Sequence, residues 1–141
     1  MQMTGTRALV RLSESDMTLT NLDEDLRGRP ITDVDGNEIG KVDDLFVDHE
    51  TGKVRMLLAG QGGILGLGKK HFLIPVDAIT SVEPQAVRIN VTGDRATLMP
   101  EFDETRGEPN FESVYTWWGY DPYWTPGYKE LDFSNYGRRA S

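Results

Sequence analysis

The glycine-rich stretch that ends in two lysines is the part of the sequence closest to a chemical motif. Gly63 and Gly68 are separated by four residues and are followed by Lys69 and Lys70, which approaches the spacing of a phosphate-binding P-loop. That chemistry needs Ser or Thr after the first lysine, to hold magnesium, and a helix whose N-terminus faces the phosphates. Lys70 takes the Ser/Thr position, and residues 72–75 are typical of a strand. We therefore expect no nucleotide site, and interpret the stretch as a loop that folds over one end of the domain. The candidate contact residues of this loop are Gly63, Leu65, Gly66 and Gly68.

Two acidic stretches also contain residue types that can bind or catalyse. Residues 33–38 resemble a calcium loop, but glycine comes fourth rather than sixth, and strands rather than helices are predicted on either side. A hairpin turn is the favoured interpretation, and weak, incidental cation binding by Asp33, Asp35 and nearby acidic residues stays open. Asp43 and Asp44 are adjacent on a predicted strand, so their side chains point to opposite faces and do not easily share one substrate. A bulge or a solvated edge is the favoured interpretation of this pair.

The other reactive residue types form no pattern of a catalytic or metal site. The chain contains no cysteine, which excludes disulfides and thiolate ligands. His49 falls in a predicted turn and His71 beside the glycine-rich loop, and neither has a partner at a typical ligand spacing. We therefore expect no catalytic residue, no cofactor and no metal, and a protein that is not an enzyme.

Aromatic residues are concentrated near the C-terminal end. Of the thirteen Phe, Tyr and Trp residues, only Phe46 and Phe72 precede residue 100. Because disordered segments are usually poor in aromatic residues, we expect residues 115–124 to be ordered and at least partly buried. This segment either packs on its own chain or crosses to a second copy or another protein, and the sequence leaves both open. The candidate interaction residues are Tyr115, Trp117, Trp118, Tyr120, Tyr123 and Trp124.

The elements that position these segments are predicted to be short strands separated by turns. Residues 54–59 are apolar at nearly every position, which is typical of a strand covered on both faces. Residues 76–79 favour a single helical turn. The remaining strand candidates are residues 29–32, 39–48, 72–74, 80–82 and 87–91. This pattern predicts an all-β fold, a small closed antiparallel barrel of about six strands.

Composition divides the chain into three parts. We expect an N-terminal arm over residues 1–25, partly disordered, with Leu19 and Leu22 docked; a barrel over residues 26–100; and an aromatic-rich extension over residues 101–141. The net charge is −8, and most of it lies in the arm and the extension. An acidic chain lacks the positive surface that nucleic acid requires, and no apolar run approaches the ~20 residues that span a bilayer. We expect no nucleic-acid partner, no membrane insertion and a cytoplasmic location.

Four sequence blocks carry a resemblance to a known family. They are GNEIGKVDD at 36–44, the turn from Asp48 through TGKV at 51–54, GGILGLGK at 62–69 and FLIPV at 72–76. In this order and spacing they resemble the PRC-barrel domain, over about residues 26–100. That domain occurs in the H subunit of bacterial photosynthetic reaction centres, in a ribosome-maturation factor and in small stand-alone bacterial proteins. The chain is most similar to the stand-alone group, because it has no membrane helix and only 25 residues before the barrel.

The resemblance implies a small β-barrel that makes protein contacts and has no shared catalytic residue. Together with the aromatic extension, it favours a non-enzymatic interaction or scaffold module that self-associates, as a homodimer, or binds another protein. The alternative is a small-ligand or ion-binding regulatory domain that uses the glycine-rich loop or the acidic turns.

Overall fold

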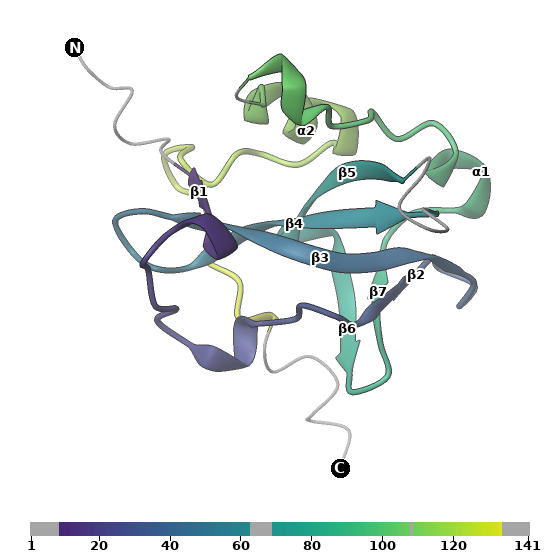
Figure 1. Ribbon diagram of the computed structural model, residues 1–141, viewed down its shortest axis with the longest axis horizontal. Coiled ribbons are helices and arrows are strands. Elements are labelled where there is room, and N and C mark those ends of the chain that lie inside the picture. Colours follow the sequence, from purple (N-terminus) through teal and green to yellow (C-terminus); the bar gives the residue numbers. More distant parts are fainter. Residues whose placement is uncertain (1–8, 63–68, 108, 134–141) are drawn as a thin grey trace.

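The computed structural model describes residues 9–62, 69–107 and 109–133, and within them a single twisted sheet dominates (Figure 1). The strands run in the order β5-β4-β3-β2-β7-β6, and β1 pairs with β3 outside this path. Their bounds are β1 Leu9–Arg11, β2 Pro30–Thr32, β3 Glu38–Asp48, β4 Val54–Gln61, β5 Lys70–Pro75, β6 Ile79–Glu83 and β7 Ala86–Ile89. Two short helices, α1 (Gly93–Ala96) and α2 (Phe111–Trp118), follow the last of these strands. The predicted all-β fold is confirmed.

The sheet curls around one apolar interior. Strands β3, β4 and β5 lie crosswise to β6 and β7, and β2 joins the two groups (Figure 1). Alternate residues of each strand point inward, as the two-residue period of a strand requires. The fully buried members of this interior cluster are Leu26, Ile31, Leu45, Val47, Leu57, Ile74, Ala78, Val87 and Ile89.

The barrel differs from the expected closed antiparallel one in two respects. β2 pairs with β7 in parallel, because the β6–β7 hairpin returns the chain in the direction of β2. Within the described residues the sheet also stays open, since its path ends at β5 and β6. Pro75 ends β5 without a backbone N–H, and the predicted single turn, Val76–Ala78, carries the chain directly from one end of the sheet to the other. Side-chain packing rather than a hydrogen-bonded ladder therefore closes this side of the barrel.

Two bulges interrupt the ladder between β3 and β4. On β3, Asp43 is the extra residue between Val42 and Asp44, which confirms the bulge expected from the broken alternation there. On β4, Arg55 is the extra residue, opposite the step from Phe46 to the next residue of β3. The second bulge was not predicted. Where both faces of a strand are apolar, the sequence does not show a shift in which residues point inward.

Residues 9–25 differ from the loose arm expected of them. β1 pairs with the end of β3, and both Leu12 and Leu19 are buried in the interior cluster. Leu19 therefore docks as expected, whereas Leu22 is 72% exposed. The short turn Leu22–Glu24 instead turns Glu24 inward, where its carboxylate accepts a hydrogen bond of 3.1 Å from the backbone N–H of Val54.

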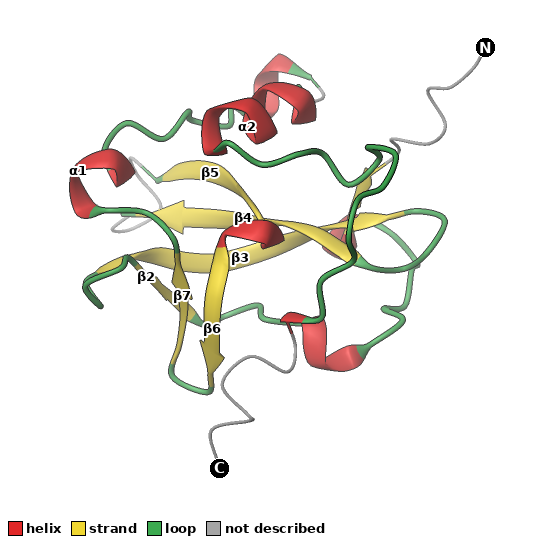
Figure 2. Cartoon of the chain, turned by 180° about the vertical axis from the view of Figure 1, so that it is seen from behind, coloured by secondary structure: helices red, strands yellow, loops and turns green. Residues whose placement is uncertain are grey.

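The C-terminal extension wraps around the barrel. α2 lies above β5 and β4, and the chain then descends along the back of the molecule (Figure 2). Asn110 caps the start of α2 by accepting a hydrogen bond from the backbone N–H of Ser113, and Gly119, with φ of 85°, ends it. Phe133 returns to the interior cluster and is only 1% exposed. The extension thus belongs to the packed domain.

Within the described residues, no helix has both the length and the apolar character needed to cross a membrane.

Candidate interaction surface

The barrel has a second apolar layer on its outer face. Side chains of β3, β4 and β5 that alternate with the interior residues form a separate cluster, which we call the outer cluster. Its barrel members are Phe46, Met56, Leu58 and Leu73. β4 is therefore covered on both faces, as its nearly continuous apolar run predicts. A barrel that was complete by itself would have polar side chains at these positions.

The extension covers this outer face with the aromatic residues singled out in the sequence. Tyr115 and Tyr123 are buried in the outer cluster, and Trp118 is buried where α2 reaches the interior cluster. The Phe46 ring packs edge to face against the rings of Phe102 and Phe111, which belong to the extension. The rings of the segment also pack edge to face, as aromatic pairs prefer. The half-buried members of the predicted set are Trp117, Tyr120 and Trp124. All six residues therefore lie on the barrel of their own chain.

The extension also covers the free edge of β5. The backbone N–H of Phe102 donates to the carbonyl oxygen of His71 at 2.7 Å. Two residues along β5, the indole N–H of Trp118 donates to the carbonyl oxygen of Leu73 at 3.2 Å. These two carbonyls point away from β4, toward a position that another strand would otherwise occupy. The extension thus blocks pairing of this edge with a foreign strand.

Polar contacts fasten α2 to the end of the barrel near α1. Arg95 lies 4.1 Å above the Trp117 ring and donates a hydrogen bond of 2.6 Å to the carbonyl oxygen of Trp117. The side-chain amide of Asn90 donates to the Tyr120 hydroxyl at 3.2 Å. Both contacts join residues after β7 to the extension, which also binds β5 through Phe102 and Trp118.

A buried arginine anchors the descending part of the extension. The Arg55 side chain, 5% exposed, makes two hydrogen bonds to the Glu130 carboxylate, at 3.0 and 3.2 Å. These bonds hold the pKa of Glu130 below its usual value. The guanidinium also lies 4.6 Å from the centre of the Tyr123 ring, and 3.8 Å from a carboxylate oxygen of Asp48. Because the bulge turns Arg55 outward, its charge meets the extension rather than the interior.

Polar groups next to this arginine are only partly satisfied. The Tyr128 hydroxyl donates to the Asp77 carboxylate at 2.8 Å. Burial raises the pKa of Asp77, and it raises the pKa values of Tyr115 and Tyr128 as well. Within the described residues, three buried side-chain nitrogen or oxygen atoms lack a hydrogen-bond partner, namely Arg55 Nε, Asp77 Oδ1 and the Tyr115 hydroxyl oxygen. A buried polar atom without a partner costs stability, so the docked extension is not optimally bound.

Two tyrosine-to-phenylalanine substitutions should distinguish a buried hydroxyl that has a hydrogen-bond partner from one that has none. Tyr115→Phe removes an unpaired buried hydroxyl and should raise the free energy of unfolding by about 1 kcal/mol. Tyr128→Phe removes the donor to Asp77 and should lower it by about 1–2 kcal/mol. Urea titration followed by tryptophan fluorescence measures both changes. A loss of stability in Tyr115→Phe equal to that in Tyr128→Phe would show that the Tyr115 hydroxyl has a partner.

The adjacent aspartates of β3 have separate partners, as their positions on a strand predict. The Asp43 carboxylate forms an ion pair with the Lys69 ammonium group, with 2.9 Å between Oδ2 and Nζ. The same Oδ2 atom lies 3.2 Å from Nε2 of His71. A side chain at Gly60 would displace the Asp43 carboxylate and the end of Lys69, so glycine leaves the space that this ion pair occupies. Asp44 is instead buried, and binds the N-terminal arm. The two carboxylates therefore do not form a shared catalytic pair.

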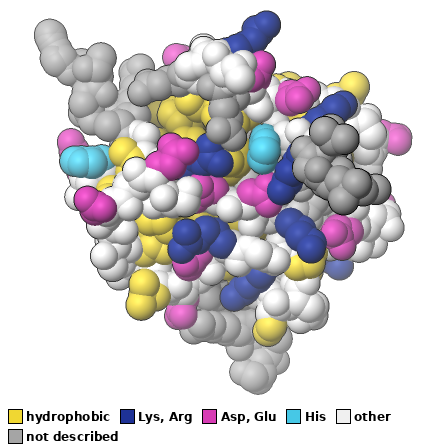
Figure 3. All heavy atoms as spheres, viewed as in Figure 1, with side chains coloured by type: hydrophobic (Ala, Val, Ile, Leu, Met, Phe, Trp, Pro, Cys, Tyr) yellow, Lys and Arg dark blue, Asp and Glu magenta, His cyan; other side chains and the backbone are white. Residues whose placement is uncertain are grey.

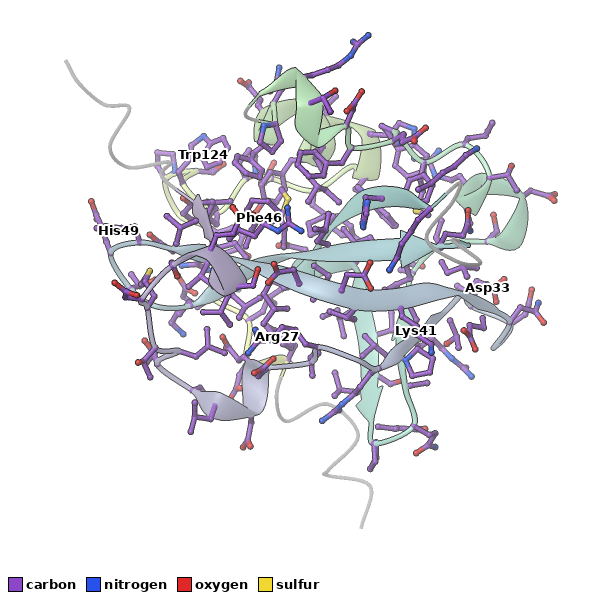
Figure 4. All side chains as sticks on the ribbon, viewed as in Figure 1. Arg27, Asp33, Lys41, Phe46, His49 and Trp124 are labelled. Atoms are coloured by element: carbon purple, nitrogen blue, oxygen red, sulfur yellow. The ribbon has the colours of Figure 1, made fainter. Side chains whose placement is uncertain are left out.

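The acidic turn has a structural role. Asp33 is 1% exposed, and its carboxylate accepts hydrogen bonds from the backbone N–H groups of Asp35 at 2.9 Å and Asn37 at 3.0 Å. These bonds hold the hairpin turn between β2 and β3, at the end of β3 where Figure 4 labels Asp33. Across the described residues, no group of three or more His, Cys, Asp or Glu side chains is arranged to hold a metal ion.

The loop residues predicted to make contacts lie outside the described residues, since Gly63, Leu65, Gly66 and Gly68 fall in the gap between 62 and 69. Near this gap, a cavity of about 450 Å³ opens between β3, β5 and the segment after α1. Ile39, Phe72, Ala96 and Met99 give it apolar walls, and charged residues such as Lys70 and Glu101 surround them. Lys70 begins β5, so a strand and not a helix follows the glycine-rich stretch, as expected.

Sequence reasoning missed the residues that attach the extension from the barrel side. Arg55 is the charged residue of an otherwise apolar strand, and a charge in a strand covered on both faces needs a buried partner. That rule predicts an acidic partner, although it does not identify Glu130. For Asp77 and Phe133 the sequence offers no comparable signal, because both are ordinary residues of a turn and a tail.

Comparison with known proteins gives one positive result. The family model for the PRC-barrel domain matches residues 20–98. A search of curated proteins found no significant match. The matched region starts in the arm and ends after α1, and so contains β2 to β7, the strands that form the path of the sheet. From this match and the fold, the chain belongs to the PRC-barrel domain family.

Proposed function

We propose that this chain is a non-enzymatic protein-interaction module that self-associates, and that the outer face of β3, β4 and β5 is its docking surface for an aromatic segment. One observation carries the proposal. Phe46, Met56, Leu58 and Leu73 form an apolar layer outside the barrel, and they are buried in one cluster with Tyr115 and Tyr123 of the aromatic segment.

The chemistry of the covering segment supports this role. Tyr and Trp provide large, rigid contact area with one polar end, which makes them frequent at the centres of protein interfaces. Here they pack on apolar strand residues, and their polar ends bind groups at the rim of the face, as Trp118 does at Leu73 and Tyr120 does at Asn90. The same face therefore fits a segment of this composition whichever chain supplies it.

The alternative of a regulatory ion site has less support. The Oδ1 atom of Asp33 already accepts two hydrogen bonds from the turn, and a cation bound to this oxygen would have to compete with them. Asp43 is likewise paired with Lys69. The interaction role makes use of the most unusual feature of the chain, whereas the ion-binding role leaves it unexplained.

Light scattering of the full chain tests the proposal. We expect a mass near twice the chain mass of 15.8 kDa at high concentration, with dissociation on dilution. Trp124→Ala removes a half-buried ring that contacts Tyr115 and Tyr123, and should weaken the dimer by about tenfold or more. Leu22→Ser, at an exposed position away from the outer face, is the matched control and should leave the dimer unchanged. A single-chain mass at every concentration would contradict self-association.

A further inference from the structure

We propose that two copies of this chain associate by exchanging their C-terminal extensions, so that residues 111–133 of each copy cover the outer face of the other barrel. The inference rests on the proposed function, because it names the partner for the same docking surface. It adds that the partner segment comes from a second copy, and that the contacts between copies are the ones now seen within one chain.

The exposed surface offers little for a side-by-side dimer. Among the described residues, the large hydrophobic side chains that are exposed are Leu22, Val34 and Leu98, on three separate segments. On the face shown in Figure 3, hydrophobic side chains are interspersed with lysines, arginines and acidic residues. The net charge of −8 also opposes the approach of two copies. Within the described ranges, the larger apolar area of the kind that a stable dimer needs therefore lies beneath the extension rather than on the surface.

The connection between barrel and extension can serve as a hinge. The last barrel contacts before it are the pairing of Glu101 with Phe72 and the hydrogen bond from Phe102 to β5. In residues 103–107, which the structure describes, local hydrogen bonds run from Thr105 and Arg106 back to Asp103. Residues 103–110 can extend to about 28 Å, enough to carry α2 to a neighbouring barrel. Exchange changes the backbone conformation of residues 103–110, and it leaves the packing within the barrel and within the extension unchanged.

Packing is loose where the extension would detach. A solvent-open pocket of about 210 Å³ lies between β5, the linker and the first turn of α2, with Leu73, Phe102 and Val114 among its lining residues. Further along, Arg55 Nε, Asp77 Oδ1 and the Tyr115 hydroxyl are buried without partners. Both features weaken attachment within one chain, and so lower the barrier to release of the extension.

The ion pair between Arg55 and Glu130 reports which chain supplies the extension. It joins β4 to the extension through two hydrogen bonds, so exchange moves it from within one chain to between two. Arg55→Glu and Glu130→Arg should each destabilise the protein alone. In an equimolar mixture, exchange brings the barrel of the Arg55→Glu chain into contact with the extension of the Glu130→Arg chain, which forms an ion pair of reversed polarity. The other barrel of the same mixed dimer then forms the native pair of Arg55 with Glu130.

The test is therefore to mix the two full-length variants, allow them to equilibrate at high concentration, and measure the melting temperature and mass. We expect a mixed dimer that melts about 4 °C or more above either variant alone. The double variant, which restores the pair within or between chains, is the control. Should a single variant not fold, a mixture of isotope-labelled and unlabelled wild-type chains gives the same information, through contacts between chains from the Trp118 indole to β5.

The outcomes separate this inference from the proposed function. Rescue on mixing, or contacts between the Trp118 indole of one chain and β5 of the other, supports exchange. A dimer without rescue, in which these contacts stay within one chain, overturns exchange and leaves self-association standing. A protein that is monomeric at all concentrations overturns both.

Discussion

Replacing Phe133 with alanine should lower the free energy of unfolding by about 3–4 kcal/mol. Phe133 is 1% exposed and belongs to the interior cluster, although it lies 33 residues beyond Pro100, where the predicted barrel ended. Because the described sheet stays open between β5 and β6, the interior depends on side chains from outside the strands. Removing a fully buried phenyl ring therefore costs both its transfer from water and the cavity that it leaves.

Urea unfolding measures this change, and hydrogen exchange shows where it acts. We expect faster exchange in the interior strands β2 and β7 as well as in the extension, since the cavity opens into the interior. Leu98→Ala, at a site 70% exposed, is the control and should change stability by less than about 0.5 kcal/mol. If only the extension exchanges faster and global stability is unchanged, Phe133 covers the barrel without completing its core.

The strands and their turns could be predicted because their signals are local. Alternation at residues 87–91, the apolar run at 54–59 and the glycine turn near Gly36 each fix an element from its own residues. The bulge at Asp43 is also a local signal, because it restores the inward phase of one strand. The gap in hydrogen bonding between β5 and β6 and the parallel pairing of β2 with β7 were not predictable in this way, since they depend on where distant strands meet.

Helix α2 shows how composition can conceal an element. Its residues include Tyr115, Trp117 and Trp118, and aromatic residues are weak helix formers, so the segment is more typical of an irregular tail. Its ends nevertheless carry helix signals, Asn110 as the N-cap and Gly119 just past the end. These two residues, which flank the eight residues of the helix, would have predicted it.

The candidate interaction surface also has one part that the sequence predicts and one part that it does not. The number of aromatic residues in the extension predicted that it is ordered and buried, because such rings are costly to leave in water. Its barrel partners were not predictable, because Arg55, Asp77 and Leu73 become neighbours only through the fold. A sequence can therefore show that a segment needs a covering surface before it shows which surface that is.

Replacing Asp44 with asparagine should lower the free energy of unfolding by about 3 kcal/mol at neutral pH. The buried carboxylate accepts hydrogen bonds from Arg11 Nε at 2.8 Å, from the Ser13 hydroxyl and from the Ser13 backbone N–H at 3.2 Å. The backbone N–H of Leu45 donates to it as well, at 2.9 Å. An asparagine amide turns one of these oxygens into a donor that faces other donors. The variant thus loses the charge and the anchor that hold the arm on β3.

The effect of this substitution should depend on pH in a defined direction. Burial pushes the pKa of Asp44 up, but the hydrogen bonds from Ser13 and Arg11 outweigh it and hold the pKa below its ordinary value of 3.8. A carboxyl with a lowered pKa in the folded state contributes stability that is present above the unfolded-state pKa and is lost as the pH falls through the folded-state pKa. The difference between wild type and Asp44→Asn should therefore be constant near neutrality and shrink below about pH 4. Asp43→Asn, which removes a half-exposed ion pair on the neighbouring residue, is the matched control and should cost about 0.5–1 kcal/mol. Equal losses for the two variants in urea titrations at pH 7 would mean that Asp44 is not the anchor of the arm.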